Sequence, residues 1–377
     1  IFVHLTLVPF ITAAGELKTK PTQHSVRELM QIGIQPHVLI CRSEHPLSDE
    51  IRRKIALFTN VEIDGVIEAR DVETIYEVPL SLKKQRLDDV IAERLGLDLP
   101  QPDMTSWTAM VNRVKHPSAG TAKIAVVGKY TDHIDSYKSI QESLIHGGIA
   151  NDVKADIHWL SSEVFDNGEG VEKLKEYDGL LIPGGFGPRG VEGMLETIRW
   201  ARENQMPFFG ICLGLQCAVI EFARNVCGLE GSHSSEFAEA SPDPVICLLD
   251  SQLQVTTMGG TMRLGAYPCA LGEGTKAREI YGVDEISERH RHRFEVNNEY
   301  RDLLTDNGMT ISGTSPDGGL VEMIELTEHP WFVAGQFHPE LKSRPTRPHP
   351  LFASFVGAAA AYARNQPAKP AAEPASV

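Results

Sequence analysis

The residues most able to do chemistry in this sequence surround one cysteine. Residues 208–216 read FFGICLGLQ, which places Cys212 between Gly210 and Gly214 where an apolar strand passes into a helix. This pattern is the cysteine form of the nucleophile elbow, a sharp turn that lifts a side chain above the end of a sheet and needs small neighbours. The N–H groups and dipole of the following helix favour a thiolate. The pattern therefore predicts that Cys212 is a catalytic nucleophile.

A second motif supplies the base that a cysteine nucleophile needs. Residues 337–340 read FHPE and follow an apolar strand expected at 331–335. In an extended segment, residues two apart lie on the same side, so Glu340 can reach the imidazole of His338. A carboxylate there sets the tautomer of the imidazole and stabilises the imidazolium that forms when the thiol loses its proton. An isolated cysteine is usually a buried apolar residue, and an isolated His-Pro pair is usually a surface turn. Together, however, the two motifs predict a Cys212–His338–Glu340 triad.

Attack on an amide creates an oxyanion, which requires two aimed hydrogen-bond donors. The N–H group of Leu213, directly after the nucleophile, is one expected donor. The loop PGGFG at 183–187 follows an apolar strand expected at 179–182 and offers the second, with Gly185 as the expected donor. A glycine-rich loop is by default a plain turn. This one is expected at the carboxyl end of a strand beside the elbow, where ligands bind in α/β sheets.

Two series of alternating strands and helices must position these residues. Strands that are apolar throughout and alternate with helices imply a parallel, doubly wound sheet. Expected in the first series are strands 2–9 and 37–41 and helices 22–32, 48–59 and 81–95. Expected in the second are strands 123–129, 179–182, 207–211 and 331–335 and helices 136–146, 191–204 and 215–226. Segments near 245–255 and 309–324 are expected to add antiparallel strands.

Length and composition bound the class of protein. A chain of 377 residues indicates two domains, expected at 1–99 and 123–365. The polar stretch 100–122, with three prolines, is expected to be a linker, and the Ala- and Pro-rich tail 366–377 to be disordered. A formal net charge of −15 argues against a nucleic-acid polymer or an anionic membrane as partner. Six cysteines without CxxC spacing favour a reducing cytoplasm.

The motifs resemble those of the class I glutamine amidotransferases, and longer stretches are similar to the CTP synthases among them. These stretches are KTKPTQHS at 18–25, PGGFGPRGVEGM at 183–194, GICLGLQ at 210–216, GGTMRLG at 259–265, ERHRHRFEVN at 288–297 and GQFHPE at 335–340. The resemblance implies an α/β fold, with a doubly wound class I amidotransferase domain preceded by the C-terminal part of a P-loop-type α/β synthetase domain. The implied activity is ATP-dependent amination of UTP to CTP, in pyrimidine biosynthesis, with ammonia from glutamine.

The resemblance also implies roles for individual residues. Beside the triad and the oxyanion donors, the glutamine site would include Gly214, Leu215, Gln216, Glu236 and Arg293, with Glu236 on the amino group and Arg293 on the carboxylate. The UTP site, where CTP binds as feedback inhibitor, would be Lys18, Thr19, Lys20, Pro21, Thr22, Gln23 and Lys54. ATP would contact Arg70, Asp71 and Val72, and the activator GTP would contact Arg263.

Chemistry bears on some of these roles independently of the resemblance. An arginine suits a carboxylate because it binds bidentately, although this does not choose Arg293 over Arg291. Thr22 is expected to cap the following helix, whose N-terminus is a natural phosphate site. His290 and His292 alternate along a charged segment, but two histidines without a third ligand rarely hold a metal.

The sequence departs from the family pattern in several places. No GxxxxGK[ST] loop is present, since Gly128-Lys129 is followed by Tyr130. The chain begins with Ile1 inside an expected strand, so we expect a truncated N-terminus with the Mg²⁺ ligands upstream, no metal site in this chain and no CTP synthesis unaided. The family implies a homotetramer at full length. The loop at 250–258 is shorter than is usual in the family, and we expect this to weaken the activation of glutamine hydrolysis by GTP.

Three alternatives remain from the sequence. One is an amidotransferase subunit that serves another acceptor, and a second is a γ-glutamyl hydrolase. The segment 18–23 argues against both, because those enzymes have no reason to carry it. The third is a non-catalytic, nucleotide-binding assembly module, and the intact triad argues against it.

Overall fold

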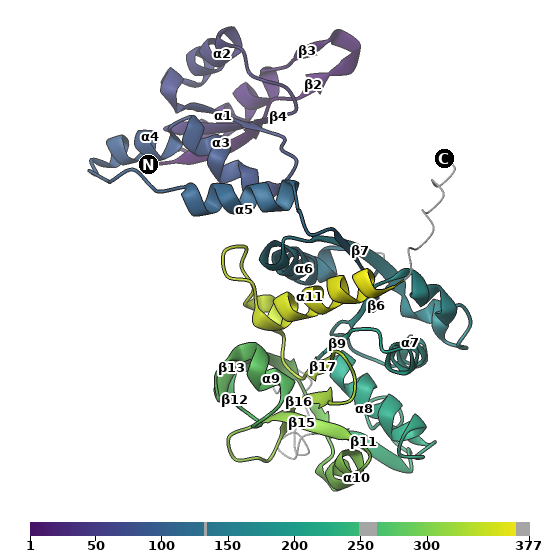
Figure 1. Cartoon of the computed structure of the whole chain (residues 1–377). Coiled ribbons are helices and arrows are strands. Elements are labelled where there is room, and N and C mark those ends of the chain that lie inside the picture. Colours follow the sequence, from purple (N-terminus) through teal and green to yellow (C-terminus); the bar gives the residue numbers. More distant parts are fainter. Residues whose placement is uncertain (132–133, 249–261, 367–377) are drawn as a thin grey trace. The chain divides into compact units, whose positions relative to one another are not determined.

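The computed structural model describes residues 1–131, 134–248 and 262–366 and divides the chain into two compact units, Ile1–His116 and Pro117–Val377 (Figure 1). The short loop expected at 250–258, most of the tail expected at 366–377 and the end of the strand region expected at 245–255 lie outside the described residues. In the part of the chain that is described, no helix is both long and apolar enough to cross a membrane.

The first unit is built on a parallel sheet in the order β1-β4-β5. Its strands are β1 (Val3–Leu7), β4 (Val38–Ser43) and β5 (Val66–Arg70), and its first two helices are α1 (Lys20–Gln31) and α2 (Asp49–Thr59). Val26 of α1 and Ile55 of α2 pack with Leu39 and Val66 of the sheet in one buried cluster. The short strands β2 (Phe10–Ile11) and β3 (Glu16–Leu17) pair as a separate ribbon.

Three sequence expectations for this unit are wrong. The single helix expected at 81–95 is two helices, α3 (Val78–Lys84) and α4 (Leu87–Leu95), because Arg86 between them is left-handed with φ 62°. Thr22 does not cap α1, which begins two residues earlier; its hydroxyl is buried and donates to the Leu7 carbonyl at 2.9 Å.

The third difference lies in the expected linker, which contains the helix α5 (Thr105–Lys115). Met110 and Val111 are buried, and the Trp107 indole donates to the Tyr76 carbonyl at 2.8 Å. Apolar residues at helical spacing stabilise this segment against the first unit, whose boundary falls after His116.

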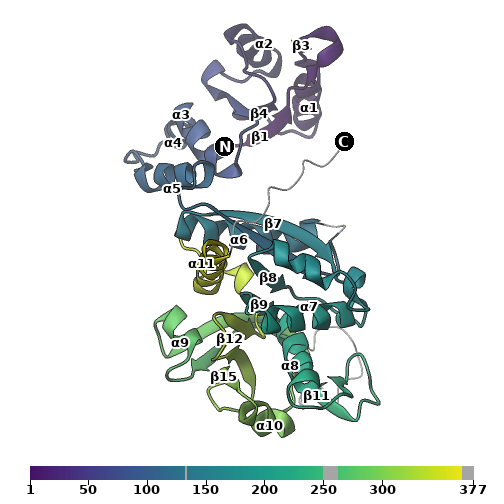
Figure 2. The ribbon, with the colours of Figure 1, turned by 45° about the vertical axis from the view of Figure 1, so that its right-hand side comes forward.

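The second unit contains a nine-stranded sheet in the order β13-β12-β15-β16-β17-β9-β8-β6-β7. Its parallel part is β17 (Phe332–Gly335), β9 (Phe208–Ile211), β8 (Gly179–Ile182), β6 (Thr121–Gly128) and β7 (Lys154–Ser161). Helices α6 (Lys138–Asn151) and α11 (Pro350–Asn365) cover one face, and α7 (Val191–Glu203) and α8 (Leu213–Asn225) cover the other (Figure 2). The doubly wound parallel sheet expected from the sequence is confirmed.

An antiparallel extension completes this sheet. It consists of β12 (Arg263–Leu271), β13 (Glu285–His292), β15 (Met309–Thr314) and β16 (Val321–Leu326), which confirms the antiparallel strands expected at 309–324. Smaller elements are β10 (Ser232–Ser234), β11 (Asp243–Leu248), β14 (Phe294–Val296), α9 (Lys276–Tyr281) and α10 (Arg301–Asp306). Along β13 the histidines are buried and the arginines are not, so its charged sequence is no simple solvent-facing strand.

Candidate active site

Cys212 occupies a strained turn between β9 and α8. Its φ of 54° and ψ of −100° lie in a region that residues with a Cβ rarely adopt, as the nucleophile elbow requires. The flanking glycines allow this turn because there is no room for a side chain at either. A Cβ on Gly210 would lie 2.8 Å from Ala334 and Gly214 atoms, and one on Gly214 would lie 2.3 Å from the Ile182 carbonyl oxygen. The turn expected from the sequence is confirmed.

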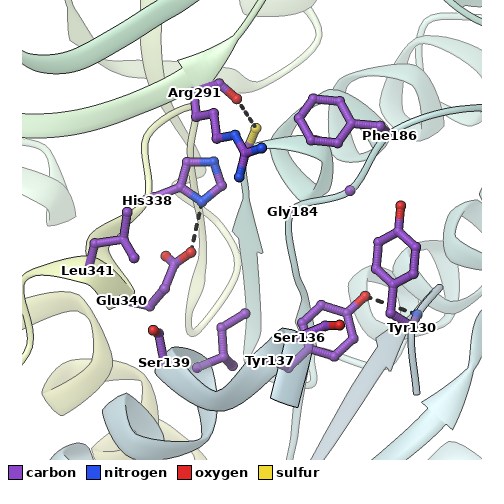
Figure 3. A pocket seen from close by; sticks show the side chains of 13 residues that line it. Tyr130, Ser136, Tyr137, Ser139, Gly184, Phe186, Arg291, His338, Glu340 and Leu341 are labelled. Carbon is purple, nitrogen blue, oxygen red and sulfur yellow. Dashed lines mark hydrogen bonds and ion pairs between the residues drawn. The ribbon is translucent and has the colours of Figure 1, made fainter. Parts of the chain in front are cut away.

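The expected base and its partner lie beside the cysteine. His338 Nδ1 and Glu340 Oε1 are 2.7 Å apart (Figure 3). The main-chain N–H of His338 donates to the Arg289 carbonyl of β13 at 2.7 Å. A Cβ on Gly184 would lie 2.8 Å from the His338 ring and 3.6 Å from the Cys212 Cβ, so both side chains lie against the same glycine. The fold therefore brings the three predicted triad residues together from β9 and the segment after β17.

The electrostatics of this group favour a charged pair. Burial opposes a charge on His338, but the nearby Cys212 sulfur and the hydrogen-bonded Glu340 carboxylate outweigh it and raise the pKa of His338 to about 11. The imidazolium is thus the stable form of His338 at neutral pH, and it lies beside the Cys212 sulfur. Nε2 of His338 is buried and makes no hydrogen bond within the described residues, so it is free to exchange a proton with the reacting groups.

Two cavities meet at Cys212. The larger, about 310 Å³, contains the triad together with Tyr130, Phe186 and Arg291 (Figure 3). The smaller, about 50 Å³, is lined by Gly185, Phe186, Cys212, Gln216, Glu236, Met262, His292, Arg293 and Phe294. The structure thus gathers Gln216, Glu236 and Arg293 around the nucleophile. It also separates the two arginines, because Arg291 lines the larger cavity and Arg293 the smaller one.

The acid and base of the smaller cavity suit a free amino acid. Burial raises the pKa of Glu236, whereas the Gly187 N–H, Lys129 and Arg293 act in the opposite direction. The Glu236 carboxylate accepts from the N–H of Gly187 at 3.1 Å, which ties it to the glycine-rich loop. A ligand ammonium beside Glu236 and a carboxylate beside Arg293 would each meet an opposite charge.

Lys129 holds the glycine-rich loop in place, a role that the sequence did not reveal. Its ammonium is largely buried and donates to the carbonyls of Phe186, at 3.3 Å, and Gly187. A Cβ on Gly185 would lie 3.2 Å from the Leu213 side chain and 3.5 Å from the Lys129 chain, so the loop lies directly over the start of α8. The two expected oxyanion donors, Gly185 and Leu213, are therefore neighbours.

Arg263 lies in a buried ion-pair group and lines neither cavity. Its guanidinium is 2.6 Å from Glu322 and 3.5 Å from Glu295, and it stacks on the Tyr267 ring at 4.5 Å. The structure therefore does not bring Arg263 together with the other expected site residues, and its role toward GTP stays a prediction.

The two alternating histidines of β13 contact each other through their ring nitrogens. His290 Nδ1 and His292 Nε2 are 2.8 Å apart, and burial lowers the pKa of both rings, to about 2 and about 3. Within residues 1–131, 134–248 and 262–366, no three histidine, cysteine or acidic side chains converge in a way that could hold a metal ion.

The residues expected to bind UTP and ATP lie in the first unit, at the carboxyl ends of its parallel strands. The Thr22 hydroxyl donates to the Leu7 carbonyl at the end of β1, and the main-chain N–H of Lys18 donates to the Pro9 carbonyl at 2.9 Å. Lys18 pairs with Glu16, whose pKa is lowered by this pair and by the charge of Lys54. The two lysines therefore lie near the same acid.

The remaining expected residues extend this edge. Lys20, Pro21 and Gln23 form the first turn of α1, where Gln23 donates to the Thr19 hydroxyl at 3.1 Å. Arg70, Asp71 and Val72 are exposed at the end of β5, and Asp71 pairs with Arg42 at 3.1 Å. Ligands of open α/β sheets bind at this edge.

Comparison with known proteins agrees with this geometry. Residues 132–358 match the family described as "Glutamine amidotransferase class-I", and residues 1–97 match "CTP synthase N-terminus". The chain is 57% identical to the CTP synthase of Clostridium perfringens strain 13 over 358 residues, which cover 95% of this chain and 67% of that protein. The chain belongs to the CTP synthase family.

Other CTP synthases show the same relation. The protein of Methanocaldococcus jannaschii is 55% identical over 364 residues, 95% of this chain and 67% of its own length. Among solved structures, the glutaminase domain of Trypanosoma brucei CTPS with bound acivicin matches with a TM-score of 0.61 and 38% identity, covering 64% of this chain and 94% of that one. The class I amidotransferase fold predicted from the sequence is therefore confirmed for a member of the CTP synthase family.

Proposed function

We propose that this chain hydrolyses glutamine at Cys212 and that the ammonia serves the amination of UTP to CTP, the reaction of its family. The observation that carries the proposal is the convergence on one strained cysteine of the His338–Glu340 pair and of a cavity containing Glu236 and Arg293. A nucleophile, a base and a site of complementary charge are the parts that amide hydrolysis of a free amino acid requires.

The first half of the reaction forms a thioester. Glutamine binds with its carboxylate at Arg293 and its amino group at Glu236, which places the side-chain amide at Cys212. The thiolate attacks the amide carbon, and the N–H groups of Gly185 and Leu213 stabilise the oxyanion. His338 Nε2 donates its proton to the leaving nitrogen, the C–N bond breaks, and ammonia departs.

The second half regenerates the enzyme. His338, now neutral, accepts a proton from a water molecule that attacks the thioester, and the tetrahedral intermediate again lies against the oxyanion donors. Collapse of the intermediate breaks the C–S bond and releases glutamate. Glu340 keeps Nδ1 of His338 protonated through both halves, so that Nε2 alone exchanges the proton.

The nucleotide sites proposed for the first unit rest on family membership and on placement at one sheet edge. Lys18, Thr19, Lys20, Pro21, Thr22, Gln23 and Lys54 would hold UTP, or CTP as inhibitor, and Arg70, Asp71 and Val72 would contact ATP. The lysines and the start of α1 suit phosphate groups. The described residues offer no cluster of acids for Mg²⁺, so the residues present do not fit the metal that the family implies.

Regulation and assembly are proposed from the family alone. GTP would activate glutamine hydrolysis, with Arg263 as a candidate contact, and the family implies a homotetramer and a cytoplasmic setting. No observation favours the alternative of a non-catalytic assembly module, since the triad and the charged cavity are both assembled.

The experiment that tests the proposal is release of ammonia from glutamine by the purified chain, with and without GTP. We expect Cys212→Ala to abolish the activity and Cys217→Ala to retain it. Cys217 is the matched control because it is a buried cysteine of the same helix α8 that lines neither cavity. Equal activity in the wild type and Cys212→Ala would contradict the proposal.

A further inference from the structure

A buried glutamine that the triad does not include touches the nucleophile. Gln336 follows β17, is completely buried, and has its Nε2 3.6 Å from Cys212 Sγ. Its main chain is fixed as well, because its N–H donates to the Glu322 carbonyl of β16 at 2.8 Å. The side chain therefore approaches the sulfur from a rigid part of the sheet.

A second buried glutamine sets the orientation of this amide. Gln216 Nε2 is 3.0 Å from the Phe294 carbonyl oxygen and 3.3 Å from Gln336 Oε1. A main-chain carbonyl can only accept hydrogen bonds, so Gln216 must present its NH₂ group to Phe294. The second hydrogen of that NH₂ is donated to Gln336, whose side-chain oxygen must therefore accept it. Gln336 consequently turns its own NH₂ toward Cys212.

The imidazole of His292 lies at the same carbonyl. His292 Nδ1 is 3.2 Å from the Phe294 oxygen and must be its donor, while its Nε2 lies 2.8 Å from His290 Nδ1, a nitrogen that Arg263 also approaches at 3.4 Å. The Phe294 carbonyl thus receives two hydrogen bonds from two buried side chains. The polarity is thus fixed from Phe294 through Gln216 to Gln336, because reversing either amide would place two donors or two acceptors face to face.

We propose that Gln336 is a further catalytic residue, which donates a side-chain N–H hydrogen bond to the Cys212 sulfur and stabilises the thiolate. The inference rests on the proposed function, since it assigns a task within glutamine hydrolysis. Gln336 then donates to the sulfur and keeps its proton, whereas the His338 imidazolium exchanges its Nε2 proton with the reacting groups. A hydrogen bond to a charged sulfur in a buried site is stronger than one between neutral groups.

The test follows the pH dependence of Cys212 alkylation by iodoacetamide, with the modified peptide quantified by mass spectrometry. Two variants remove the donor: Gln336→Met, similar in length, and Gln336→Glu, nearly isosteric. We expect the alkylation midpoint of Cys212 to rise by about one to two pH units in both, with kcat/KM for glutamine reduced about 10- to 100-fold at neutral pH. The control Ile324→Val changes the buried core of the adjacent strand β16 and should leave the midpoint unchanged.

The outcomes separate this inference from the proposed function. Cys227 is the internal reference, because burial raises the pKa of its thiol and it lies outside the site. A wild-type midpoint for Cys212 equal to that of Cys227 would overturn the function itself and this inference with it. A low wild-type midpoint that neither Gln336 variant moves would overturn the inference alone, even if both variants lost activity through disturbed packing. If Gln336→Met does not fold, Gln336→Glu decides the question in the same way.

Discussion

Replacing Gly214 with alanine should disable the oxyanion site while leaving the triad chemically intact. Gly214 is in the first turn of α8, and its φ is not among the positive values, so alanine suits its backbone conformation. The obstacle is steric. The new Cβ would lie 2.3 Å from the Ile182 carbonyl oxygen and 3.1 Å from the Ile182 side chain.

The size of the effect follows from where the clash lies. Ordinary contact begins at 3.4 Å, so the end of β8 and the start of α8 must separate by about 1 Å. Ile182 leads into the loop that carries Gly185, and α8 begins with Leu213, so the separation moves the two oxyanion donors apart. A misplacement of about 1 Å can reduce the rate about 10²-fold, and overpacking costs about 1–3 kcal/mol of stability. The loss should fall on kcat, since the oxyanion forms only in the reaction.

The assay combines steady-state glutamine hydrolysis with urea unfolding. The matched control is Gly148→Ala, whose Cβ would lie 2.6 Å from the Val153 carbonyl but whose position lines neither cavity. We expect similar losses in the free energy of unfolding for both variants and a loss of kcat for Gly214→Ala only. A folded Gly214→Ala variant with kcat within about twofold of wild type would refute the placement of the oxyanion donors.

Four further predictions concern side chains. Arg293→Met should raise KM for glutamine about 10- to 100-fold and leave kcat nearly unchanged, because its ion pair with the carboxylate forms in ground and transition states alike. Glu340→Gln should reduce kcat about 10²- to 10⁴-fold and lower the pKa of His338, measured by NMR. In the wild type, protonated His338 stabilises the fold below pH 6.5, and this contribution declines as the pH rises through about 11. Arg202→Met should cost about 3–5 kcal/mol in urea unfolding, since it leaves the buried carboxylate of Glu221 without its bidentate partner.

For each of the three variants, a control or a specific result would contradict the prediction. Arg291→Met is the control for Arg293, and an equal rise of KM in both would mean that the smaller cavity does not select the carboxylate. An unchanged titration of His338 in Glu340→Gln would show that the 2.7 Å contact does not set its charge. Glu203→Ala, which removes an exposed carboxylate that pairs with Arg199 and Arg202, should cost less than about 1 kcal/mol.

The local geometry around Cys212 and between His338 and Glu340 was predictable from the sequence because it depends on residues close together in the chain. The glycines flanking Cys212 indicate a turn without room for side chains. The two-residue spacing of His338 and Glu340 indicates that their side chains lie on the same side of the extended chain. The strand at 179–182 was predicted with its correct ends, because a short apolar run followed by proline and glycines is too short for a buried helix.

What the sequence did not reveal depends on contacts between distant segments. Gln336 meets Gln216 across 120 positions, and no spacing rule relates them. Sequence reasoning excluded Lys129 from a phosphate loop and assigned it no other role, whereas in the structure it donates to the carbonyls of Phe186 and Gly187. Helix α5 was missed because the prolines around it suggested a linker, whereas burial of Met110 and Val111 stabilises it.

The most direct test of the central claim is the site of covalent labelling by a diazoketone analogue of glutamine. Such a reagent needs both the glutamine cavity and an activated thiolate, so it reads out the whole site in one step. We predict a single adduct on Cys212, suppressed by excess glutamine and absent in Arg293→Met at low reagent concentration, with Cys227 unmodified. Labelling spread over several cysteines, or labelling of Cys212 that glutamine does not suppress, would contradict the assignment of this chain as a glutamine-hydrolysing enzyme.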